Sequence, residues 1–284
     1  MRNKIFKNLC IILVSFKSKK KVEKTIKNLN KKISVILVEN SKDISVKKDF
    51  EKKYKNLKVI IPKSNDGQGA AFNLGAKLTN KKYLLFIDMD IDINDNQIIS
   101  LMKKAAKVKN FGVLTPKIKN HNYKNSILSK KENNLFEVNF NHGAVMLIKK
   151  NILKKIKYFD ENIFLYFEES DIYQKCRNKG LPVYMFDKVI VTNPISKAID
   201  NKYIKEYLKI RNWHYCWSKF YYYKKHQGYL NGLYKTLPNL IRSIKKIFIC
   251  VIKFRFKEIG YFKAEISGLF CSYLNLKSFY RMKN

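Results

Sequence analysis

The carboxylates of this chain are concentrated in two short segments. Of 22 Asp and Glu residues, four lie between Asp88 and Asp95 and five between Asp160 and Asp171, although Lys and Arg number 59 and the formal net charge is +37. Crowded carboxylates repel one another unless a cation lies among them, and a hard divalent metal ion takes oxygen ligands of this kind. The first segment therefore predicts a metal site.

Asp88 and Asp90 form a D-x-D pair directly after an apolar run, Tyr83 to Ile87. Such a run predicts a buried strand, and ligands bind at the carboxyl ends of strands in parallel sheets. One carboxylate could hold a ribose or a metal ion, and the other the metal ion, with Mg²⁺ or Mn²⁺ bridging to a diphosphate. The alternative is a solvated turn leading into a helix that starts near Asp95.

The segment from Asn65 to Gly75 predicts a glycine-containing loop that opens a helix. Its glycines let the backbone approach a ligand, and amides at a helix start favour an anion. It matches neither G-x-x-x-x-G-K-[ST] nor G-x-G-x-x-G. The alternative is a helix that packs closely through Gly69, Ala70 and Gly75.

The second acidic segment places Glu168, Glu169 and Asp171 directly after the aromatic run Phe164 to Phe167. Apolar surroundings can raise the pKa of a carboxylate toward that of a useful general base. The alternative is an acidic helix cap at Ser170 or Asp171.

Apolar runs that alternate with helical patterns predict an α/β fold, a doubly wound and mainly parallel sheet flanked by helices. The expected strands are Leu9 to Val14, Ile33 to Val38, Leu57 to Ile61, Tyr83 to Ile87, Gly112 to Leu114, Val183 to Phe186 and Val189 to Thr192. Apolar residues also return from Val138 to Ile148, after a Lys/Asn/Ser loop from Asn120 to Asn134. A further helix is expected from Asp171 to Lys179, ended by Gly180.

The amino-acid composition of the chain changes near residue 200, so we expect a catalytic domain over 1–200 and a helical region over 201–284. The second region has 18 Lys and Arg against 3 acids, and 20 of the 39 aromatic residues. Its helical stripe could lie in a membrane interface or pack on the sheet domain. The stripe consists of Leu237, Ile241, Ile244, Phe248 and Val251.

Composition narrows the classes of protein to which this chain could belong. Five cysteines without a C-x-x-C pair suggest neither a zinc knuckle nor a disulfide framework, and a reducing compartment fits best. No run approaches the roughly 18 apolar residues of a membrane span. The positive charge favours an anionic partner such as nucleic acid, a membrane surface or a phosphorylated substrate, although drift in base composition would also enrich Lys, Asn and Ile.

Several motifs in order resemble the family 2 glycosyltransferases, in particular the branch with rhamnosyltransferases and galactofuranosyltransferases. The resemblance runs from about Leu9 to Thr192, and Arg211-Asn212 is similar to a segment that follows the catalytic domain in that branch. The motifs are Ser15-Phe16, Glu39-Asn40-Ser41, Asn65-x-Gly67 to Asn73-x-Gly75, Asp88-x-Asp90, Gly143-Ala144, Phe159-Asp160-Glu161 and Glu168-Glu169-x-Asp171.

The resemblance implies a GT-A fold, a nucleotide-sugar donor, a divalent metal ion and inversion at the anomeric carbon. It places Glu39 at the nucleotide base, Asp88 at the ribose or metal ion, Asp90 at the metal ion and Glu169 in the role of catalytic base. The family usually has Asp at the positions of Glu39 and Glu169, and many members have a metal-binding His where this chain has Asn193. The implied donor-binding set is Ser15, Glu39, Asn65, Gly67, Asn73 and Asp88, the metal set is Asp88, Asp90 and Asn193, and the catalytic set is Glu169, Glu168 and Asp171.

We therefore expect an inverting, metal-dependent hexosyl- or deoxyhexosyltransferase of polysaccharide biosynthesis. It would use Mg²⁺ or Mn²⁺ and a UDP- or dTDP-linked sugar, and would act on a lipid-linked or growing glycan as a peripheral protein at the cytoplasmic face of an anionic membrane. One alternative is a nucleic-acid-binding protein that stacks bases on the aromatics from Trp213 to Tyr223. Another is an inactive relative of the same family. We expect no nucleic acid partner, and the sequence leaves the oligomeric state open.

Overall fold

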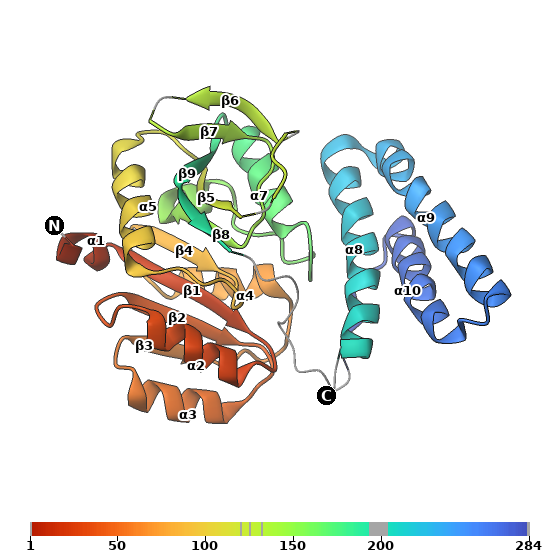
Figure 1. Ribbon diagram of the computed structural model, residues 1–284, viewed down its shortest axis with the longest axis horizontal. Coiled ribbons are helices and arrows are strands. Elements are labelled where there is room, and N and C mark those ends of the chain that lie inside the picture. Colours follow the sequence, from red (N-terminus) through yellow and green to blue (C-terminus); the bar gives the residue numbers. More distant parts are fainter. Residues whose placement is uncertain (1, 120, 125, 132, 193–203, 283–284) are drawn as a thin grey trace. The chain divides into compact units, whose positions relative to one another are not determined.

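The computed structural model describes residues 2–119, 121–124, 126–131, 133–192 and 204–282, shown in Figure 1. The chain forms two compact units. The first unit comprises Met1–Phe159 and Ile172–Ile199, and the second comprises Asp160–Asp171 and Asp200–Asn284. The acidic segment Asp160–Asp171 thus groups with the C-terminal helices.

Within the described residues, the first unit contains one nine-stranded sheet in the order β3-β2-β1-β4-β8-β5-β9-β7-β6. The predicted apolar runs form its strands because nearly every side chain in the central ones is buried on one face or the other. The strands are β1 (Leu9–Ser15), β2 (Ser34–Glu39), β3 (Leu57–Ile60), β4 (Tyr83–Ile87), β5 (Val113–Ile118), β6 (Ile127–Lys131), β7 (Leu135–Val138), β8 (Val145–Lys149) and β9 (Val183–Val191).

Parallel pairing covers β3-β2-β1-β4 and β5-β9, and the predicted α/β fold class is confirmed. Strand β8 is inserted between β4 and β5 and runs antiparallel to both. Because β8 runs against β4, the residues that precede β8 lie at the same edge as the residues that follow β4.

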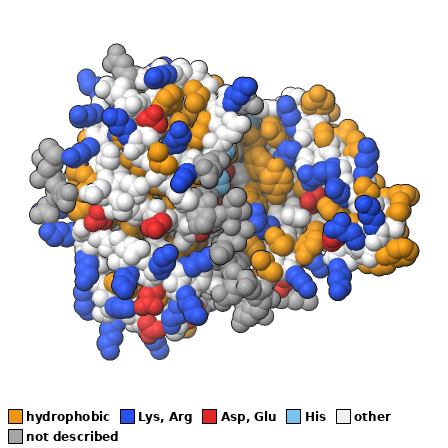
Figure 2. All heavy atoms as spheres, in the orientation of Figure 1, with side chains coloured by type: hydrophobic (Ala, Val, Ile, Leu, Met, Phe, Trp, Pro, Cys, Tyr) orange, Lys and Arg blue, Asp and Glu red, His pale blue; other side chains and the backbone are white. Residues whose placement is uncertain are grey.

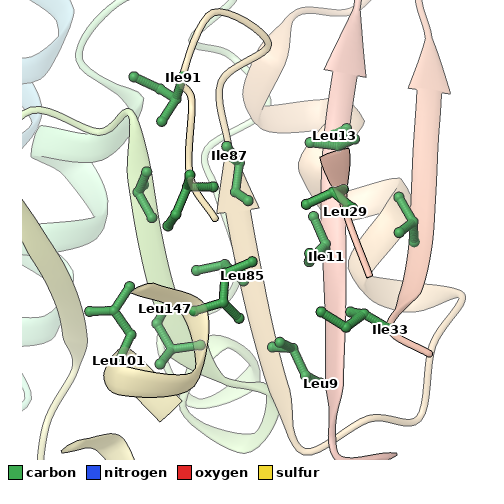
Figure 3. Close-up of a cluster of buried hydrophobic side chains, with 14 of the residues drawn as sticks. Leu9, Ile11, Leu13, Leu29, Ile33, Leu85, Ile87, Ile91, Leu101 and Leu147 are labelled. Atoms are coloured by element: carbon green, nitrogen blue, oxygen red, sulfur yellow. The ribbon is translucent and has the colours of Figure 1, made fainter. Parts of the chain in front are cut away.

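Helices cover both faces of the sheet. Leu9, Ile11 and Leu13 pack with α2, α3 and α5, whereas Cys10 and Ile12 belong to the core with α4, α6 and α7. Figure 3 shows the first of these cores. The helices of this unit are α1 (Arg2–Lys7), α2 (Lys19–Asn28), α3 (Ile44–Lys53), α4 (Gln68–Lys77), α5 (Asp95–Lys107), α6 (Lys150–Lys155) and α7 (Glu168–Arg177), whose first turn belongs to the second unit.

Two sequence expectations about strands were wrong. The predicted loop from Asn120 to Asn134 contains β6, which pairs with β7 as a hairpin. The two strands expected between Val183 and Thr192 are one strand, β9, whose pairing with β5 shifts register between Pro116 and Lys117. The polar residues that suggested a break therefore lie at a register irregularity within a continuous strand.

The second unit packs α8 (Ile204–Gln227), α9 (Tyr229–Ile252) and α10 (Phe256–Tyr273) against one another. Small residues allow close contact, since Gly268 on α10 lies against the backbone of Trp213 on α8. No helix in the part of the chain that the structure describes is long and apolar enough to cross a membrane.

We predict that Gly268→Ala destabilises the protein by about 1–3 kcal/mol, although Ala is the better helix former. A Cβ at this position would overlap the Trp213 carbonyl group, which cannot move unless the two helices separate. Urea unfolding measures the change.

The matched control is Gly260→Ala on the same helix. A Cβ at Gly260 would meet the end of the flexible Lys209 side chain, with Cε at 2.9 Å and Nζ at 3.2 Å. This variant should be neutral or more stable by up to about 1 kcal/mol. Equal losses in both variants would contradict the proposed backbone contact.

Candidate functional site

Polar residues at the ends of β1, β2 and β4 meet at one edge of the sheet. Ser15 is paired with Glu39 across β1 and β2, and Leu13 is paired with Ile87 across β1 and β4. The Asn40 amide donates to the Ser15 carbonyl at 2.8 Å. The register therefore brings together the predicted donor-binding residues Ser15, Glu39 and Asp88.

A turn directly after β4 carries Asp88 and Asp90. The Asp88 amide donates to the Ala144 carbonyl at 2.9 Å, and the Ile91 amide donates to the Asp88 carbonyl at 3.1 Å. The side chain of Asp88 accepts a hydrogen bond from Gln68 Nε2 at 2.6 Å. Gln68 is the first residue of α4, so the glycine-containing loop and the D-x-D pair form one site.

The two carboxylates provide the kind of ligand that Mg²⁺ and Mn²⁺ prefer. Both side chains are half-buried, and Asp90 makes no ion pair among the described residues. Nowhere in the described residues do three or more His, Cys, Asp or Glu side chains form a group that could hold a metal ion. Two carboxylates alone do not fill the coordination shell of Mg²⁺ or Mn²⁺, so an ion held here would take its remaining ligands from a diphosphate and water. Asn193, the third predicted ligand, lies outside the described residues.

A glycine and uncapped backbone form the start of α4. Gly67 precedes the helix with φ of +100°, a conformation that favours glycine, and no side chain caps the helix start. The Gly67 amide donates to Asn65 Oδ1 at 3.2 Å, which fixes the loop. Further along the helix, a Cβ at Gly75 would meet Ile12 Cγ2 at 2.7 Å, so close packing also explains part of the glycine pattern.

Glu39 and Ser15 are both about 2% exposed. The carboxylate of Glu39 accepts hydrogen bonds from the amides of Ser41 at 3.2 Å and Asp43 at 2.7 Å, which orients it in its own loop. Ser15 Oγ is buried and makes no hydrogen bond within the described residues. The edge thus contains one oriented carboxylate and one unsatisfied hydroxyl group.

Asn73 has a different role from the predicted contact with the donor. Its Nδ2 donates to the Phe159 carbonyl at 3.0 Å, and its Oδ1 accepts from the Phe159 amide at 2.9 Å. The side chain is 1% exposed, so both polar ends are engaged inside the first unit. Asn73 therefore fixes the chain just before the second acidic segment.

The sequence did not reveal the buried amide of Asn141. Its Nδ2 donates to the Pro116 carbonyl at 3.0 Å, and its Oδ1 accepts from Tyr123 Oη at 2.9 Å and from the His142 amide at 2.8 Å. These bonds anchor the segment that leads to Ala144, the partner of Asp88. Burial lowers the pKa of His142 below its usual value, and the negative charge of Asp90 partly opposes that shift.

The acidic segment of the second unit contains strained backbone just before α7. Tyr166 and Phe167 have φ of +67° and +71°, a conformation that costs energy in residues with a side chain. Arg211 Nε donates to the Tyr166 hydroxyl, and the Phe167 ring lies 5.4 Å from the Tyr222 ring. The strained turn positions the start of α7, where Glu168 and Glu169 follow.

Glu168, Glu169 and Asp171 all lie in the first turn of α7, where the helix dipole favours negative charge. Glu168 is 5% exposed and Glu169 is half-buried. Loss of solvation raises the pKa of Glu169 to about 6. This carboxylate is ionised at neutral pH and is a better proton acceptor than a solvated one.

Asp171 is fully buried and is paired with Lys225 and His226 on α8. Its Oδ1 accepts from Lys225 Nζ at 2.5 Å and from His226 Nε2 at 2.8 Å. Lys225 also contacts Asp160 Oδ2 at 2.6 Å, and Tyr221 Oη donates to the same oxygen at 3.0 Å. Burial alone would lower the pKa of Lys225, but hydrogen bonds to the two carboxylates raise it above its usual value. Asp171 therefore positions the acidic segment.

Comparison with known proteins gives consistent matches. Residues 10–177, more than half of the chain, match the family described as glycosyl transferase family 2. The low-salt glycan biosynthesis hexosyltransferase Agl10 of Haloferax volcanii is 25% identical over 233 residues, which cover 72% of this chain and 74% of that protein.

Solved structures share the fold. The mannosyltransferase PcManGT from Pyrobaculum calidifontis, in complex with GDP-Man and Mn²⁺, aligns with a TM-score of 0.59 at 12% identity, over 94% of this chain and 87% of that one. TarS 1-349 of S. aureus aligns with a TM-score of 0.54 at 15% identity, over 92% and 90% of the two chains. The expected GT-A-type architecture is thereby confirmed.

We predict that Lys225→Met lowers the free energy of unfolding by about 2–3 kcal/mol, because it leaves two carboxylates of low exposure without their shared cation. The Lys225 side chain is 27% exposed, so the loss should be smaller than for a fully buried pair. Lys205→Met, at an exposed position of the same helix, should change stability by less than about 0.5 kcal/mol. Equal effects in denaturant titrations would show that the ion pairs do not fix the segment.

Proposed function

Because the chain belongs to family 2 of the glycosyltransferases, we propose that it transfers a hexosyl or deoxyhexosyl group from a nucleotide sugar to a glycan acceptor with inversion. The observation that carries this proposal is the D-x-D turn at the carboxyl ends of the parallel strands. A single displacement by the acceptor hydroxyl accounts for inversion and requires no protein nucleophile. The relative Agl10 is named as a hexosyltransferase of glycan biosynthesis, which supports the same class of reaction.

On the donor side, Asp88 and Asp90 would hold Mg²⁺ or Mn²⁺. When bound, the ion would neutralise charge on the diphosphate of a UDP- or dTDP-linked sugar as the glycosidic bond breaks. PcManGT was solved with GDP-Man and Mn²⁺, which supports a nucleotide sugar and a divalent ion for this fold. Gln68 orients Asp88, and the uncapped start of α4 favours the negative charge of a phosphate.

On the acceptor side, Glu169 takes the proton from the attacking hydroxyl group. Its raised pKa strengthens it as a base while leaving it ionised at neutral pH. Asp171 and Lys225 fix the turn of helix that carries it. Glu168 and Asp171 were also candidates for this proton transfer, but the ion pairs of Asp171 favour a positioning role.

We place the enzyme at the cytoplasmic face of a membrane, acting on a lipid-linked or growing glycan. A pyrophosphate-linked lipid acceptor is anionic, and the 18 Lys and Arg residues over 201–284 would attract both that acceptor and the leaflet. The acidic edge of the sheet does not fit the alternative of nucleic acid binding, because carboxylates repel phosphates unless a cation lies between them.

Thermal unfolding with a panel of nucleotide sugars tests the donor site. We expect one donor, at about 100 times its dissociation constant with Mn²⁺, to raise Tm by about 5–10 °C. Asp90→Asn should abolish the Mn²⁺-dependent part of this rise, whereas Asp92→Asn, at the next acidic position, should retain it. Loss of the rise in both variants, or in neither, would contradict the assignment of Asp90.

The pH dependence of transfer tests Glu169. We expect kcat/KM to rise with pH through an acidic limb with a midpoint at about 6, and Glu169→Gln to lose about 10²-fold to 10⁴-fold in activity. Glu161→Gln, at an exposed position of the same segment, should retain activity.

A measurement of stability against pH gives a second readout for Glu169 that needs no substrate. A folded-state pKa raised from 4.5 to about 6 contributes stability that is complete below pH 4.5 and is lost as the pH rises through 6. Glu169→Gln should therefore be more stable than the parent at pH 8 by a margin that disappears at pH 4. A constant margin would show that the pKa is not raised.

A further inference from the structure

Helix α9 packs into the second unit through its polar side. Its buried residues are Gly232, Thr236, Asn239, Ser243 and Cys250, which lie three, four or seven apart and form one stripe. Thr236 donates to the Gly232 carbonyl at 2.7 Å, and Ser243 donates to the Asn239 carbonyl at 2.9 Å. The hydrogen-bonding groups of α9 therefore face the other helices.

Most of the large apolar side chains of α9 point outward, whereas Leu233, Leu240 and Ile247 are partly buried. Leu230 is 79% exposed and Phe248 is 70% exposed, and the face continues into the turn after the helix, where Phe254 is 81% exposed. The arrangement reverses that of an ordinary surface helix, whose apolar stripe faces the core. We call this surface the apolar face of α9, and it consists of Leu230, Tyr234, Leu237, Ile241, Ile244, Phe248, Ile249, Val251, Ile252, Phe254 and Phe256.

The surroundings of the apolar face carry a net positive charge, although Arg242 is paired with Glu265 at 3.0 Å and Arg255 is paired with Glu258. From Tyr229 to Lys257 the sequence has seven Lys and Arg residues and no Asp or Glu. Lys245, Lys246 and Lys253 are all exposed. Figure 2 shows hydrophobic side chains interspersed with Lys and Arg over the surface of this unit.

We propose that the apolar face of α9 docks onto an anionic lipid bilayer, with the helix lying in the interface. Exposed aliphatic and aromatic side chains flanked by Lys and Arg suit the boundary between acyl chains and anionic headgroups. A lipid surface offers both apolar depth and negative charge.

A second copy of the chain fits less well. The spacing of the residues from Leu230 to Val251 alternates between four and three, as in a coiled-coil seam. However, Ile249 and Ile252 widen the face beyond such a seam. A second copy would also bring another surface of net positive charge, whose acidic neighbours Glu258 and Glu265 are already paired with Arg255 and Arg242.

Docking in this way would hold the enzyme where lipid-linked acceptors are found, and that consequence rests on the proposed function. The docking itself does not, because vesicle binding needs neither donor nor transfer. Failure of one proposal can therefore be distinguished from failure of the other.

Co-sedimentation with vesicles of phosphatidylcholine, alone or mixed with phosphatidylglycerol, tests the proposal. The full chain should bind the mixed vesicles and bind phosphatidylcholine alone at least about tenfold more weakly. Ile241→Ser with Phe248→Ser should weaken binding to mixed vesicles at least about tenfold. Ile44→Ser with Leu128→Ser, at exposed apolar positions of the first unit, should not weaken binding to mixed vesicles.

A matched pair of triple variants tests how much positive charge contributes to vesicle binding. Lys245→Gln, Lys246→Gln and Lys253→Gln together should weaken binding about a hundredfold, and added salt should weaken binding of the parent. Lys47→Gln, Lys48→Gln and Lys52→Gln on α3 remove the same charge from exposed positions of the first unit and should have little effect. Equal losses from both triple variants would overturn a specific docking face.

Two further measurements test whether protein, rather than lipid, covers the apolar face of α9. Ile241→Ser with Phe248→Ser should leave Tm unchanged, because a lipid-facing surface is exposed in the free protein. A clear fall in Tm would show that protein covers the face and would overturn the proposal. So would failure of the parent to bind mixed vesicles, or a dimer in light scattering that this double variant dissociates.

Discussion

Hydrogen bonding on the two sides of β4 (Tyr83–Ile87) determines where the chemistry of this chain can occur. Parallel pairing with β1 aligns the end of β4 with Ser15 and Glu39, and antiparallel pairing with β8 places the Ala144 carbonyl opposite the Asp88 amide. The D-x-D turn is therefore fixed by the sheet itself. A slip of one residue in either pairing would reverse the faces of the strand side chains and displace Asp88 from Gln68, so the buried core also protects the site.

The two acidic segments compensate their charge in different ways. Asp160 and Asp171 are paired with Lys225, a cation supplied by the chain, and their carboxylates hold the start of α7 in place. Asp90 makes no ion pair among the described residues, although the protein has 59 Lys and Arg residues. Asp90 is half-buried and has no lysine partner among the described residues. Its carboxylate is therefore suited to bind a cation that enters the site together with a ligand. Two carboxylates of the second segment are thus neutralised by a cation of the chain, whereas Asp90 in the first segment has no such partner among the described residues.

The sequence predicted the parts of the fold that depend on local pattern. The runs around β1 and β4 are apolar on both faces, which is typical of strands buried between helices, and the motifs at their ends identified the family. It could not predict the hairpin strand β6, whose residues are almost all exposed and show no alternation of apolar and polar side chains. Nor could it predict the partners of Asn73 and Asp171, which lie 86 and 54 or 55 residues away along the chain. The stripe on α9 was recognised, but only the structure shows that its polar side packs inward.

Crystals grown with Mn²⁺ and a nucleotide sugar, measured at the manganese absorption edge, test the central claim most directly. The anomalous signal identifies the ion independently of the protein density. We expect a peak at bonding distance from a carboxylate oxygen of Asp90 and from the donor diphosphate. A bound donor with no ion at this turn, or an ion held by other residues, would contradict it.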